Sequence, residues 1–532
     1  MPPGAVLRSS EGDQMRAAWF PAAILAAFAL ALGLRLAAPG ARPMHHDEAN
    51  QAVKFGELLE SGDYRYDPDD HHGPSLYYLT LPAAWLRGQH TLAALDEGTL
   101  RGVTAFFGAG LILLLPLMAG GIGRPAAAVA ALLIALSPAL TYYSRFYIQE
   151  SVFAFFAAGF LVALGRYAGA GDPRWRRRWA VAAGVFAGLA YATKETSIIV
   201  GVAALVAWAA ASALVRGGRP RVALGDLLVA AAAALGVAIV FYSSFFRHPA
   251  GPLESFLAFA TYFQRGVEPA GHAHPPGYYL RILGYTSSGG LVWTEAAILA
   301  LAVAGGAVAV RRARTSFWPA YLAIYSFAAG LVFSLLTYKT PWNLVPFHAG
   351  FAILAGIGVT GLWKAVAPAW GRALLVVALA TAVWHLGVQN VRANLTYPAD
   401  ERNPYAYVQT SPDFLRLAER VHQLARVHED GREMLVKVVA GPYEQWPLPW
   451  YLRDMTRVGY WTGAGEAEGL AGTPVVVASQ EHASAVEAAL GDGYVSEFYG
   501  LRPNVLLTVF IDATLWERFL SVPPDRREDL PY

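Results

Sequence analysis

The chain contains no cysteine among its 532 residues. Disulfide bonds, thiolate nucleophiles and metal sites with cysteine ligands are therefore excluded. Charge is also scarce, because Asp, Glu, Lys and Arg together make up 15% of the chain, whereas an ordinary soluble domain carries about a quarter. No stretch has the clustered basic character of a nucleic-acid-binding surface. Hydrophobic residues make up 55% instead, so the composition predicts an integral membrane protein without a nucleic-acid partner.

Long apolar runs dominate the chain up to about residue 390. The first run, at 17–38, exceeds the apolar core of a cleaved signal peptide, about 7–15 residues, and predicts a retained signal anchor. The run at 179–215 is too long for one span, because about 20 residues cross the hydrocarbon core. It carries Lys194 and Glu195 at its middle, so we expect two helices that turn at this pair. The other runs, which bring the total to about eleven spans, lie at 100–119, 125–143, 152–168, 224–246, 288–310, 317–337, 344–363 and 373–390.

Loops rich in arginine alternate with loops poor in arginine along the chain. Since cytoplasmic loops carry the Lys/Arg excess, we expect the rich loops and the N-terminus in the cytoplasm of a multi-pass plasma-membrane protein. The alternation requires that residues 75–88, a short segment with Pro82, form an interfacial helix on the outer leaflet instead of a span. The basic residues of the cytoplasmic loops are Arg124, Arg174, Arg176, Arg177, Arg178, Arg216, Arg219, Arg221, Arg311, Arg312, Arg314, Lys364 and Arg372.

The opposite, extracytoplasmic face then receives the loop at 39–99 and the C-terminal region. We therefore expect a transmembrane domain at 1–390 and a soluble extracytoplasmic domain at 391–532. In the second domain, helical patterns alternate with β-rich runs, which is typical of a small layered α/β structure. The helical patterns lie at 411–428, 481–490 and 514–520, and the β-rich runs at 434–440, 474–478 and 505–511. The remaining external segments are the turns at 144–151, 194–196 and 338–343 and the loop at 247–287.

Ionisable residues gather directly after the first span. His45, His46, Asp47 and Glu48 are consecutive. Carboxylates just above the membrane surface can act as a general base or as hard metal ligands. The alternative is a solvated loop that simply carries charges, and for the later residues Asp63, Asp67 and Asp69 this alternative is favoured. A divalent metal, with His45 and Asp47 as candidate ligands, is left open because such a run is not a specific metal signature.

The same loop resembles the opening of a known superfamily. The segments DEA at 47–49, SGDY at 61–64 and HGPSLYY at 72–78 are similar to those of the protein O-mannosyltransferases and lipid A aminoarabinose transferases, whose fold is called GT-C. A closer likeness is to the bacterial and archaeal "flippase activity-associated" membrane proteins. The resemblance covers residues 17–390. It implies a GT-C-like transmembrane domain in which the acidic residue of the first external loop, here Asp47, is the catalytic base.

Other short motifs extend the resemblance. The turn at 142–151 is similar to the second acidic motif of the superfamily, with Glu150 where relatives carry Asp; a structural ion pair between Arg145 and Glu150 is the alternative. The turn at 338–343 is similar to a late lysine- and proline-containing turn, which implies that Lys339 lies beside the donor phosphate, with membrane anchoring as the alternative. Lys194 is a further candidate for binding the donor phosphate. The alternative is that its side chain extends to a phosphate group of the surrounding lipids. The candidate substrate contacts are His46, His72, Tyr77, Tyr78, His274 and Trp342.

Two further features carry open alternatives. Glu295 lies within an apolar run and needs a polar partner that the sequence does not identify. The segment at 443–454 is rich in aromatic residues, including Trp446 and Trp450. This segment could stack on sugar rings, or it could form a core that docks on the membrane bundle, which we favour for the two tryptophans.

These parts predict an inverting glycosyltransferase that uses a polyprenyl-phosphate-linked hexose or pentose. The leaving phosphate needs cations, for which Arg145, Lys194 and Lys339 are the candidates. The acceptor hydroxyl needs one positioned carboxylate, Asp47, supported by Glu48 or Glu150. The expected partners are the lipid-linked sugar, membrane lipids and an acceptor protein, glycolipid or polysaccharide. The alternatives are a flippase or transporter, disfavoured because the charges gather at one face without an inverted repeat, and a non-catalytic membrane scaffold.

Overall fold

The computed structural model of the chain describes residues 7–69, 72–216, 222–267 and 271–523. Arg219 and Arg221 of the predicted cytoplasmic loops lie outside the described residues. The chain forms two compact units, the first comprising residues 1–39, 63–80 and 101–397, and the second comprising residues 40–62, 81–100 and 398–532. The predicted domain boundary at residue 390 stays a prediction.

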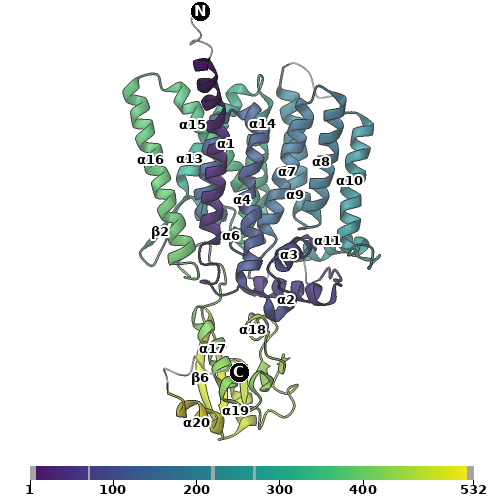
Figure 1. Cartoon of the computed structure of the whole chain (residues 1–532), viewed down its shortest axis with the longest axis vertical. Coiled ribbons are helices and arrows are strands. Elements are labelled where there is room, and N and C mark those ends of the chain that lie inside the picture. Colours follow the sequence, from purple (N-terminus) through teal and green to yellow (C-terminus); the bar gives the residue numbers. More distant parts are fainter. Residues whose placement is uncertain (1–6, 70–71, 217–221, 268–270, 524–532) are drawn as a thin grey trace, which may run out of the picture. The chain divides into compact units, whose positions relative to one another are not determined.

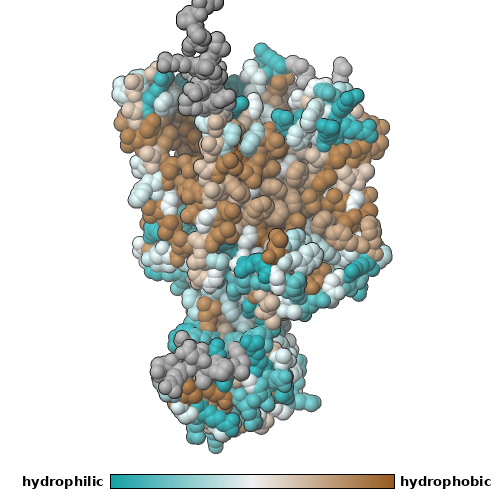
Figure 2. Space-filling view, in the orientation of Figure 1, coloured by the Kyte–Doolittle hydropathy of each residue, from teal (hydrophilic) through white to brown (hydrophobic). Residues whose placement is uncertain are grey.

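The first unit is a bundle of long helices, which Figure 1 shows side by side. Its members are α1 (Leu7–Leu36), α4 (Glu97–Ile122), α5 (Arg124–Leu136), α6 (Pro138–Ser144), α7 (Glu150–Gly169), α8 (Pro173–Tyr191), α9 (Ser197–Leu214), α10 (Leu224–Tyr242), α13 (Ala296–Arg312), α14 (Phe317–Leu335), α15 (Val345–Ala365) and α16 (Ala369–Val391). Large apolar side chains such as Leu205, Leu228 and Leu374 are exposed on it. Figure 2 shows the resulting hydrophobic surface over the helices, which suits a surface that faces lipid.

The polytopic helical fold is therefore confirmed, and the predicted count of about eleven spans compares with eight or nine candidates by length and composition. Among the described residues, eight helices are long and apolar enough to cross a membrane, or nine if the pair α5 and α6, bent by 61°, is one span. The helices at the two remaining predicted spans are present but shorter in their apolar part. The N-terminal turns of α8 carry Arg174, Arg176, Arg177 and Arg178, and α13 has 17 residues.

The predicted turn inside the run at 179–215 is present in the structure. The run at 179–215 divides into α8 and α9, and Lys194 and Glu195 lie in the turn that joins them, as predicted. The predicted interfacial segment forms α3 (Ser75–Leu86), whose 12 residues are about half of what a span requires. Its position on the outer leaflet stays a prediction. The other α-helices and strands described before residue 397 are α2 (His46–Ser61), α11 (Gly251–Val267), α12 (Tyr278–Gly284), β1 (Thr286–Ser288) and β2 (Leu291–Trp293).

The second unit contains a five-stranded mixed sheet in the order β4-β3-β5-β7-β6. Strands β4, β3 and β5 are parallel, and β7 pairs antiparallel with β5 and β6. Apolar clusters pack on both faces of the sheet, so the central strands β3 and β5 are fully buried. The strands are β3 (Val436–Val439), β4 (Val458–Trp461), β5 (Val475–Ser479), β6 (Tyr494–Arg502) and β7 (Val505–Asp512), and the helices are α17 (Asp413–Val427), α18 (Leu448–Tyr451), α19 (Ala483–Leu490) and α20 (Ala513–Ser521).

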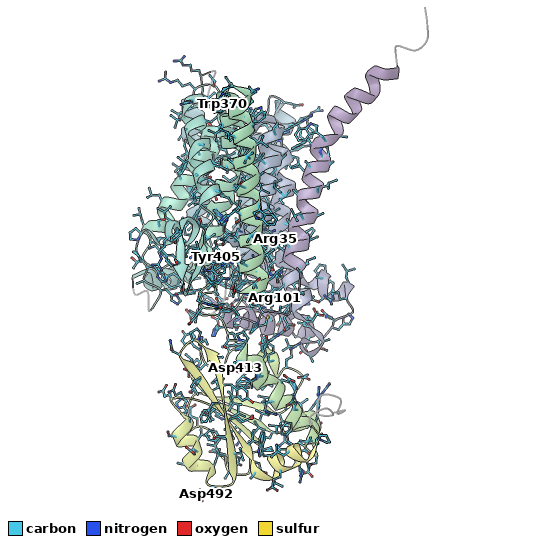
Figure 3. All side chains as sticks on the ribbon, turned by 90° about the vertical axis from the view of Figure 1, so that its left-hand side faces the viewer. Arg35, Arg101, Trp370, Tyr405, Asp413 and Asp492 are labelled. Atoms are coloured by element: carbon cyan, nitrogen blue, oxygen red, sulfur yellow. The ribbon has the colours of Figure 1, made fainter. Side chains whose placement is uncertain are left out.

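The predicted α/β alternation is thus present, with each predicted strand and helix found within a few residues. The edge strands β4 and β6 were missed, because most of their residues are partly buried or exposed and carry no continuous apolar run. Asp413, at the start of α17, joins this helix to β6 by accepting a 2.8 Å hydrogen bond from the backbone N–H of Gly500. Figure 3 labels Asp413 beside the sheet.

Candidate active site

The first candidate carboxylates lie at the start of α2, in the second unit. His45 caps this helix, because its Nδ1 accepts a 3.1 Å hydrogen bond from the backbone N–H of Asp47. Glu48 completes the capping box by accepting a 3.0 Å hydrogen bond from the backbone N–H of His45. The sequence His-x-x-Glu therefore fixes the backbone around Asp47.

The two neighbouring carboxylates have different environments. Glu48 has no exposed surface, and its Oε2 also accepts from the guanidinium of Arg42 at 3.1 Å. The side chain of Asp47 is 41% exposed. Asp47 is therefore the carboxylate that a substrate can reach, whereas Glu48 serves the helix start and the Arg42 ion pair.

His45 is a weaker metal candidate than its sequence position indicates. Its Nδ1 accepts from the Asp47 N–H, which leaves the proton on Nε2, and Nε2 lies 3.1 Å from the carbonyl oxygen of Tyr407. Both ring nitrogens thus have protein partners. Across the part of the chain that the structure describes, no group of three or more His, Asp or Glu side chains is placed to hold a metal ion.

The first unit brings three of the predicted turns together in one buried cluster. Lys194, in the turn between α8 and α9, donates to Oε1 of Glu150 at the start of α7 and to Oδ1 of Asn343 at 3.2 Å. Lys194 is 5% exposed and Glu150 2%. Near the same turns, the ring of Trp342 lies 6.5 Å from that of Tyr143. The cluster therefore joins the second acidic motif, the lysine turn and the late lysine- and proline-containing turn.

Arg145 contacts the C-terminal end of α1. Its guanidinium donates to the carbonyl oxygens of Leu34 and Arg35, each at 3.0 Å, and of Ala38 at 3.3 Å. These carbonyls lie at the C-terminal end of α1, where backbone oxygens lack helical partners. Arg145 thus closes the end of α1, while Glu150 pairs with Lys194.

His72 lies against the lysine turn. Its Nδ1 is 2.8 Å from Oε2 of Glu195, which is 3% exposed. The adjacent Gly73 packs so closely that a Cβ atom there would lie 2.3 Å from the carbonyl oxygen of Ala192. Ser75 continues the contact, because its Oγ is 2.7 Å from Oγ1 of Thr193. The HGPS segment at 72–75 therefore packs directly against the turn at 192–195.

The remaining predicted substrate residues lie in packed aromatic or loop environments. Tyr77 is fully buried, with its ring 4.9 Å from that of Tyr64, and the ring of Tyr78 lies 4.8 Å from that of Phe245. His274 stacks on Tyr278 at 4.1 Å. Their roles in substrate binding stay predictions.

The ammonium of Lys339 is held by two backbone carbonyl oxygens. It donates to the carbonyl oxygens of Leu336 and, at 2.8 Å, of His274. An antiparallel bridge between Ala273 and Tyr338 joins the same two segments. Burial lowers the pKa of Lys339 below its ordinary value. These contacts stabilise the loop, and a contact with the donor phosphate stays a prediction.

The partner of Glu295, which the sequence left open, is His348. Its Nε2 lies 2.8 Å from Oε2 of Glu295, which also accepts from the hydroxyl of Ser137 at 2.6 Å. The other carboxylate oxygen accepts from the backbone N–H of Ala139 at 2.8 Å. The signal in the sequence that could have identified this partner is the single histidine, His348, inside the apolar run at 344–363.

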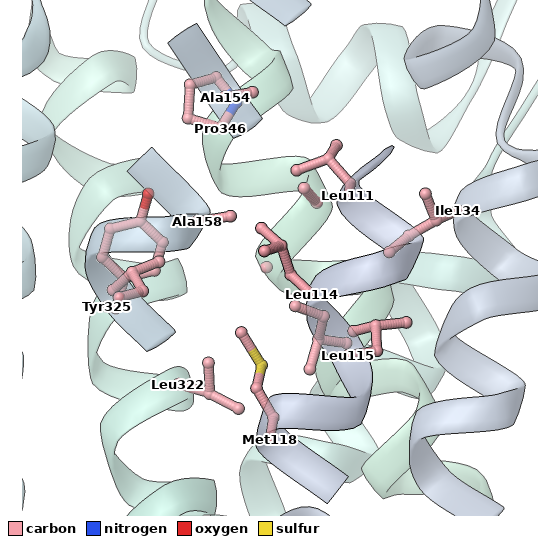
Figure 4. A pocket seen from close by; sticks show the side chains of 14 residues that line it. Leu111, Leu114, Leu115, Met118, Ile134, Ala154, Ala158, Leu322, Tyr325 and Pro346 are labelled. Atoms are coloured by element: carbon pink, nitrogen blue, oxygen red, sulfur yellow. The ribbon is translucent and has the colours of Figure 1, made fainter. Parts of the chain in front are cut away.

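An apolar cavity lies inside the bundle, among α4, α5, α7, α14 and α15 (Figure 4). Its lining is apolar except for the hydroxyl of Tyr325, and it contains no charged side chain. The lining residues are Leu111, Leu114, Leu115, Met118, Ile134, Ala154, Ala158, Leu161, Leu322, Tyr325, Pro346, Ala349, Gly350 and Ile353. The candidate chemistry therefore belongs to the polar turns and to the start of α2.

Comparison with known proteins supports this assignment of the fold. Residues 80–247 match the family described as dolichyl-phosphate-mannose-protein mannosyltransferase, which is less than half of the chain. ArnT from Cupriavidus metallidurans, solved with bound undecaprenyl phosphate, is similar with a TM-score of 0.61 and 17% identity, covering 92% of this chain and 97% of that chain. The chain shares its fold. No curated protein matches the chain in sequence.

The shared fold extends to a second solved protein. The archaeal oligosaccharyltransferase AglB from Archaeoglobus fulgidus, in complex with an inhibitory peptide and a dolichol-phosphate, has a TM-score of 0.57 and 15% identity, covering 95% of this chain and 77% of that chain. The multi-pass GT-C-like architecture expected from the sequence is confirmed by these similarities. Membership of the "flippase activity-associated" group stays a prediction.

Proposed function

We propose that the chain is an inverting glycosyltransferase that moves a sugar from a polyprenyl-phosphate donor to an acceptor hydroxyl on the extracytoplasmic face. The observation that carries the proposal is the buried cluster of Lys194, Glu150 and Asn343. A buried ammonium at the convergence of three polar turns provides what a departing lipid phosphate requires. The fold similarity to two proteins solved with undecaprenyl phosphate and dolichol-phosphate supports this donor class.

Asp47 is the proposed general base. As the acceptor oxygen attacks the anomeric carbon, the bond from that carbon to the phosphate oxygen breaks, and the hydroxyl proton passes to the Asp47 carboxylate. One displacement of this kind inverts the anomeric centre. The exposure of Asp47, against the full burial of its neighbour Glu48, supports this choice between the two carboxylates.

Lys194 is the proposed ligand of the donor phosphate. Within the described part of the chain, the ammonium uses two side-chain partners, Glu150 and Asn343, and an ammonium has donors beyond these two. The pair with Glu150 fixes the position of the amine, so little side-chain freedom is lost when phosphate binds. Arg145 and Lys339 are proposed as secondary cationic groups; each donates to backbone carbonyl oxygens.

The test of the activity is transfer from a radiolabelled polyprenyl-phosphate sugar by purified protein in detergent. Asp47→Asn is expected to lower the rate by roughly 10²–10⁴-fold, the range for loss of a positioned base. Asp67→Asn, which removes an exposed carboxylate of the same loop, is the matched control and is expected to retain the rate. Wild-type turnover by Asp47→Asn would overturn the assignment of the base. Absence of transfer combined with lipid translocation in vesicles would favour the flippase.

The proposed compartments have a separate test. Because the chain lacks cysteine, single substitutions can report accessibility without background. Asp67→Cys and Thr337→Cys are expected to react with a membrane-impermeant thiol reagent from outside the cell, whereas Gly171→Cys is expected to react only after permeabilisation. Labelling of the first two from opposite sides would contradict the proposal.

A further inference from the structure

Three aromatic rings meet at the start of α2. The ring of His46 lies 5.8 Å from that of Tyr443 and 5.9 Å from that of Trp446. The tyrosine is 74% exposed, and both His46 and Trp446 are half-buried. All three residues belong to the second unit. We name this group the aromatic platform.

The loop that carries the platform is fixed from several sides. Arg502 donates to the carbonyl oxygen of Tyr443 at 2.7 Å. Gln445 donates to the carbonyl oxygens of Ala440, at 2.9 Å, and Trp461, at 3.3 Å. The rings are therefore presented by a backbone that needs little ordering when a ligand binds.

Trp450 belongs to the same loop as Tyr443 but has the environment of a structural residue. It has no exposed surface, its indole N–H donates to Glu97 at 3.0 Å, and the guanidinium of Arg453 lies 3.9 Å above its ring. Trp450 therefore belongs to the packed interior of its unit, and docking on the membrane bundle, which the sequence favours for both Trp446 and Trp450, stays a prediction. Tyr443 differs, because a ring that is 74% exposed gains little from burial on folding. Its exposure favours a contact with a ligand.

Polar groups suited to a sugar flank the platform. The carboxylate of Asp47, on the residue next to His46, is 41% exposed. The guanidinium of Arg502 lies beside the platform, where it donates to the carbonyl oxygen of Tyr443 at 2.7 Å. A pyranose or furanose presents C–H groups with partial positive charge on one face, which the negative face of an aromatic ring attracts. Its hydroxyls point outward in the ring plane, where a carboxylate and a guanidinium can bind them.

We infer that Tyr443, Trp446 and His46 form the binding site for a carbohydrate acceptor. The inference rests on the proposed function, because it places the hydroxyl of the acceptor sugar next to the base Asp47. A sugar stacked on the platform has its hydroxyl edge toward the carboxylate of the residue that follows His46. The substrate class is thus a glycan or the sugar headgroup of a glycolipid, and the C-terminal region selects the acceptor.

The experiment measures sugar binding directly, by saturation-transfer NMR on the full-length protein in detergent. The probes are methyl α-mannoside, methyl β-glucoside, hexyl β-glucoside and a serine-containing tetrapeptide. We expect transfer from aromatic protons to the sugar C–H groups in the wild type. Tyr443→Ala and Trp446→Ala are each expected to weaken sugar binding by roughly 2- to 13-fold, the range for one aromatic contact. Tyr443→Phe is expected to retain it.

Phe498→Ala is the matched control, since Phe498 is 67% exposed on β6 of the same sheet. It is expected to leave the signal unchanged, which excludes a general effect of removing a surface ring. A stronger signal from hexyl than from methyl β-glucoside identifies a glycolipid headgroup, and equal signals identify a free glycan. Equal loss in all variants, no sugar signal in the wild type, or a signal from the peptide alone would overturn the inference.

A kinetic measurement separates this inference from the proposed function. With an acceptor that supports transfer, Tyr443→Ala is expected to raise the acceptor KM while the donor KM and the rate of donor hydrolysis stay unchanged. Asp47→Asn is expected to lower the transfer rate by roughly 10²–10⁴-fold, while saturation transfer from the aromatic platform to the sugar remains. If no transfer occurs but the platform variants lose sugar binding, the proposed function fails and the sugar site stands.

Discussion

The Nε2 atom of His348 lies 2.8 Å from the Oε2 atom of Glu295, and neither side chain has any exposed surface. The same carboxylate accepts hydrogen bonds from Ser137 and from the backbone of Ala139, the residues at which α6 begins. The sharp bend between α5 and α6 leaves backbone groups that helical hydrogen bonds cannot satisfy. The buried pair therefore holds the start of α6, the helix that leads to the turn before Glu150.

Removal of the Glu295 carboxylate is expected to destabilise the bundle. In Glu295→Ala, the hydroxyl of Ser137, the N–H of Ala139 and the ring of His348 lose a partner at a buried position, and breaking a buried pair costs about 3–5 kcal/mol. Glu295→Gln keeps the shape and is expected to cost less. Thermal unfolding in detergent measures both. Thr381→Ala, which removes an exposed hydroxyl bonded within its own helix, should leave the melting temperature nearly unchanged, and an equal loss there would contradict the expectation.

The pair of Lys194 and Glu150 permits a separation of stability from donor binding. Lys194→Met alone leaves the buried carboxylate of Glu150 without its cation, so a loss of about 3–5 kcal/mol in unfolding free energy is expected. The double variant with Glu150→Gln contains no uncompensated charge and is expected to recover most of this stability.

Transfer is not expected to recover with stability in that double variant. A charge-assisted hydrogen bond contributes about 1.5–3 kcal/mol, so the donor KM of the double variant should stay raised by roughly 10- to 150-fold. Melting temperature and donor KM, measured on the same samples, test the two effects. A double variant that is both stable and kinetically normal would show that Lys194 serves structure alone.

The sequence predicted helices, turns and strands well because apolar length and periodicity are local properties. The predicted count of about eleven spans exceeds the eight or nine candidates because the first turns of α8 carry arginines and α13 has 17 residues. The partners of the ionisable residues depended on the fold. Lys194 lies 44 residues from Glu150 in the chain, and the buried carboxylate of Glu48 pairs with Arg42, 6 residues before it. Neither relationship leaves a pattern in the order of the residues.

Gly73 provides a test of the contact between the HGPS segment and the lysine turn. In Gly73→Ala, the new Cβ would lie 2.3 Å from the carbonyl oxygen of Ala192, which is backbone and cannot rotate away. We expect displacement of His72 from Glu195, lower thermal stability and reduced transfer. Gly33→Ala, in α1, meets no atom within 4 Å and is expected to be neutral in both assays. A neutral Gly73→Ala would contradict the close approach.

His46 is expected to make stability depend on pH. Burial lowers the pKa of His46 below its ordinary value of 6.5, and the nearby His45 and Arg502 lower it further, while Asp47 and the Tyr443 backbone offset part of this effect. Below about pH 6.5 the unfolded chain therefore binds a proton that the folded chain resists. Above this pH the titration of His46 does not lower the unfolding free energy. As pH falls below it, protonation of His46 in the unfolded chain lowers the unfolding free energy.

The variant His46→Gln removes this proton uptake. Its melting temperature is expected to fall less than that of the wild type between pH 7.5 and pH 5.5, measured by thermal unfolding in detergent. His90→Gln, which alters an exposed histidine of the same unit, should keep the wild-type slope and so corrects for titration elsewhere. Since the altered ring belongs to the aromatic platform, a wild-type slope in His46→Gln would show that His46 is less buried than its contacts with Tyr443 and Trp446 require.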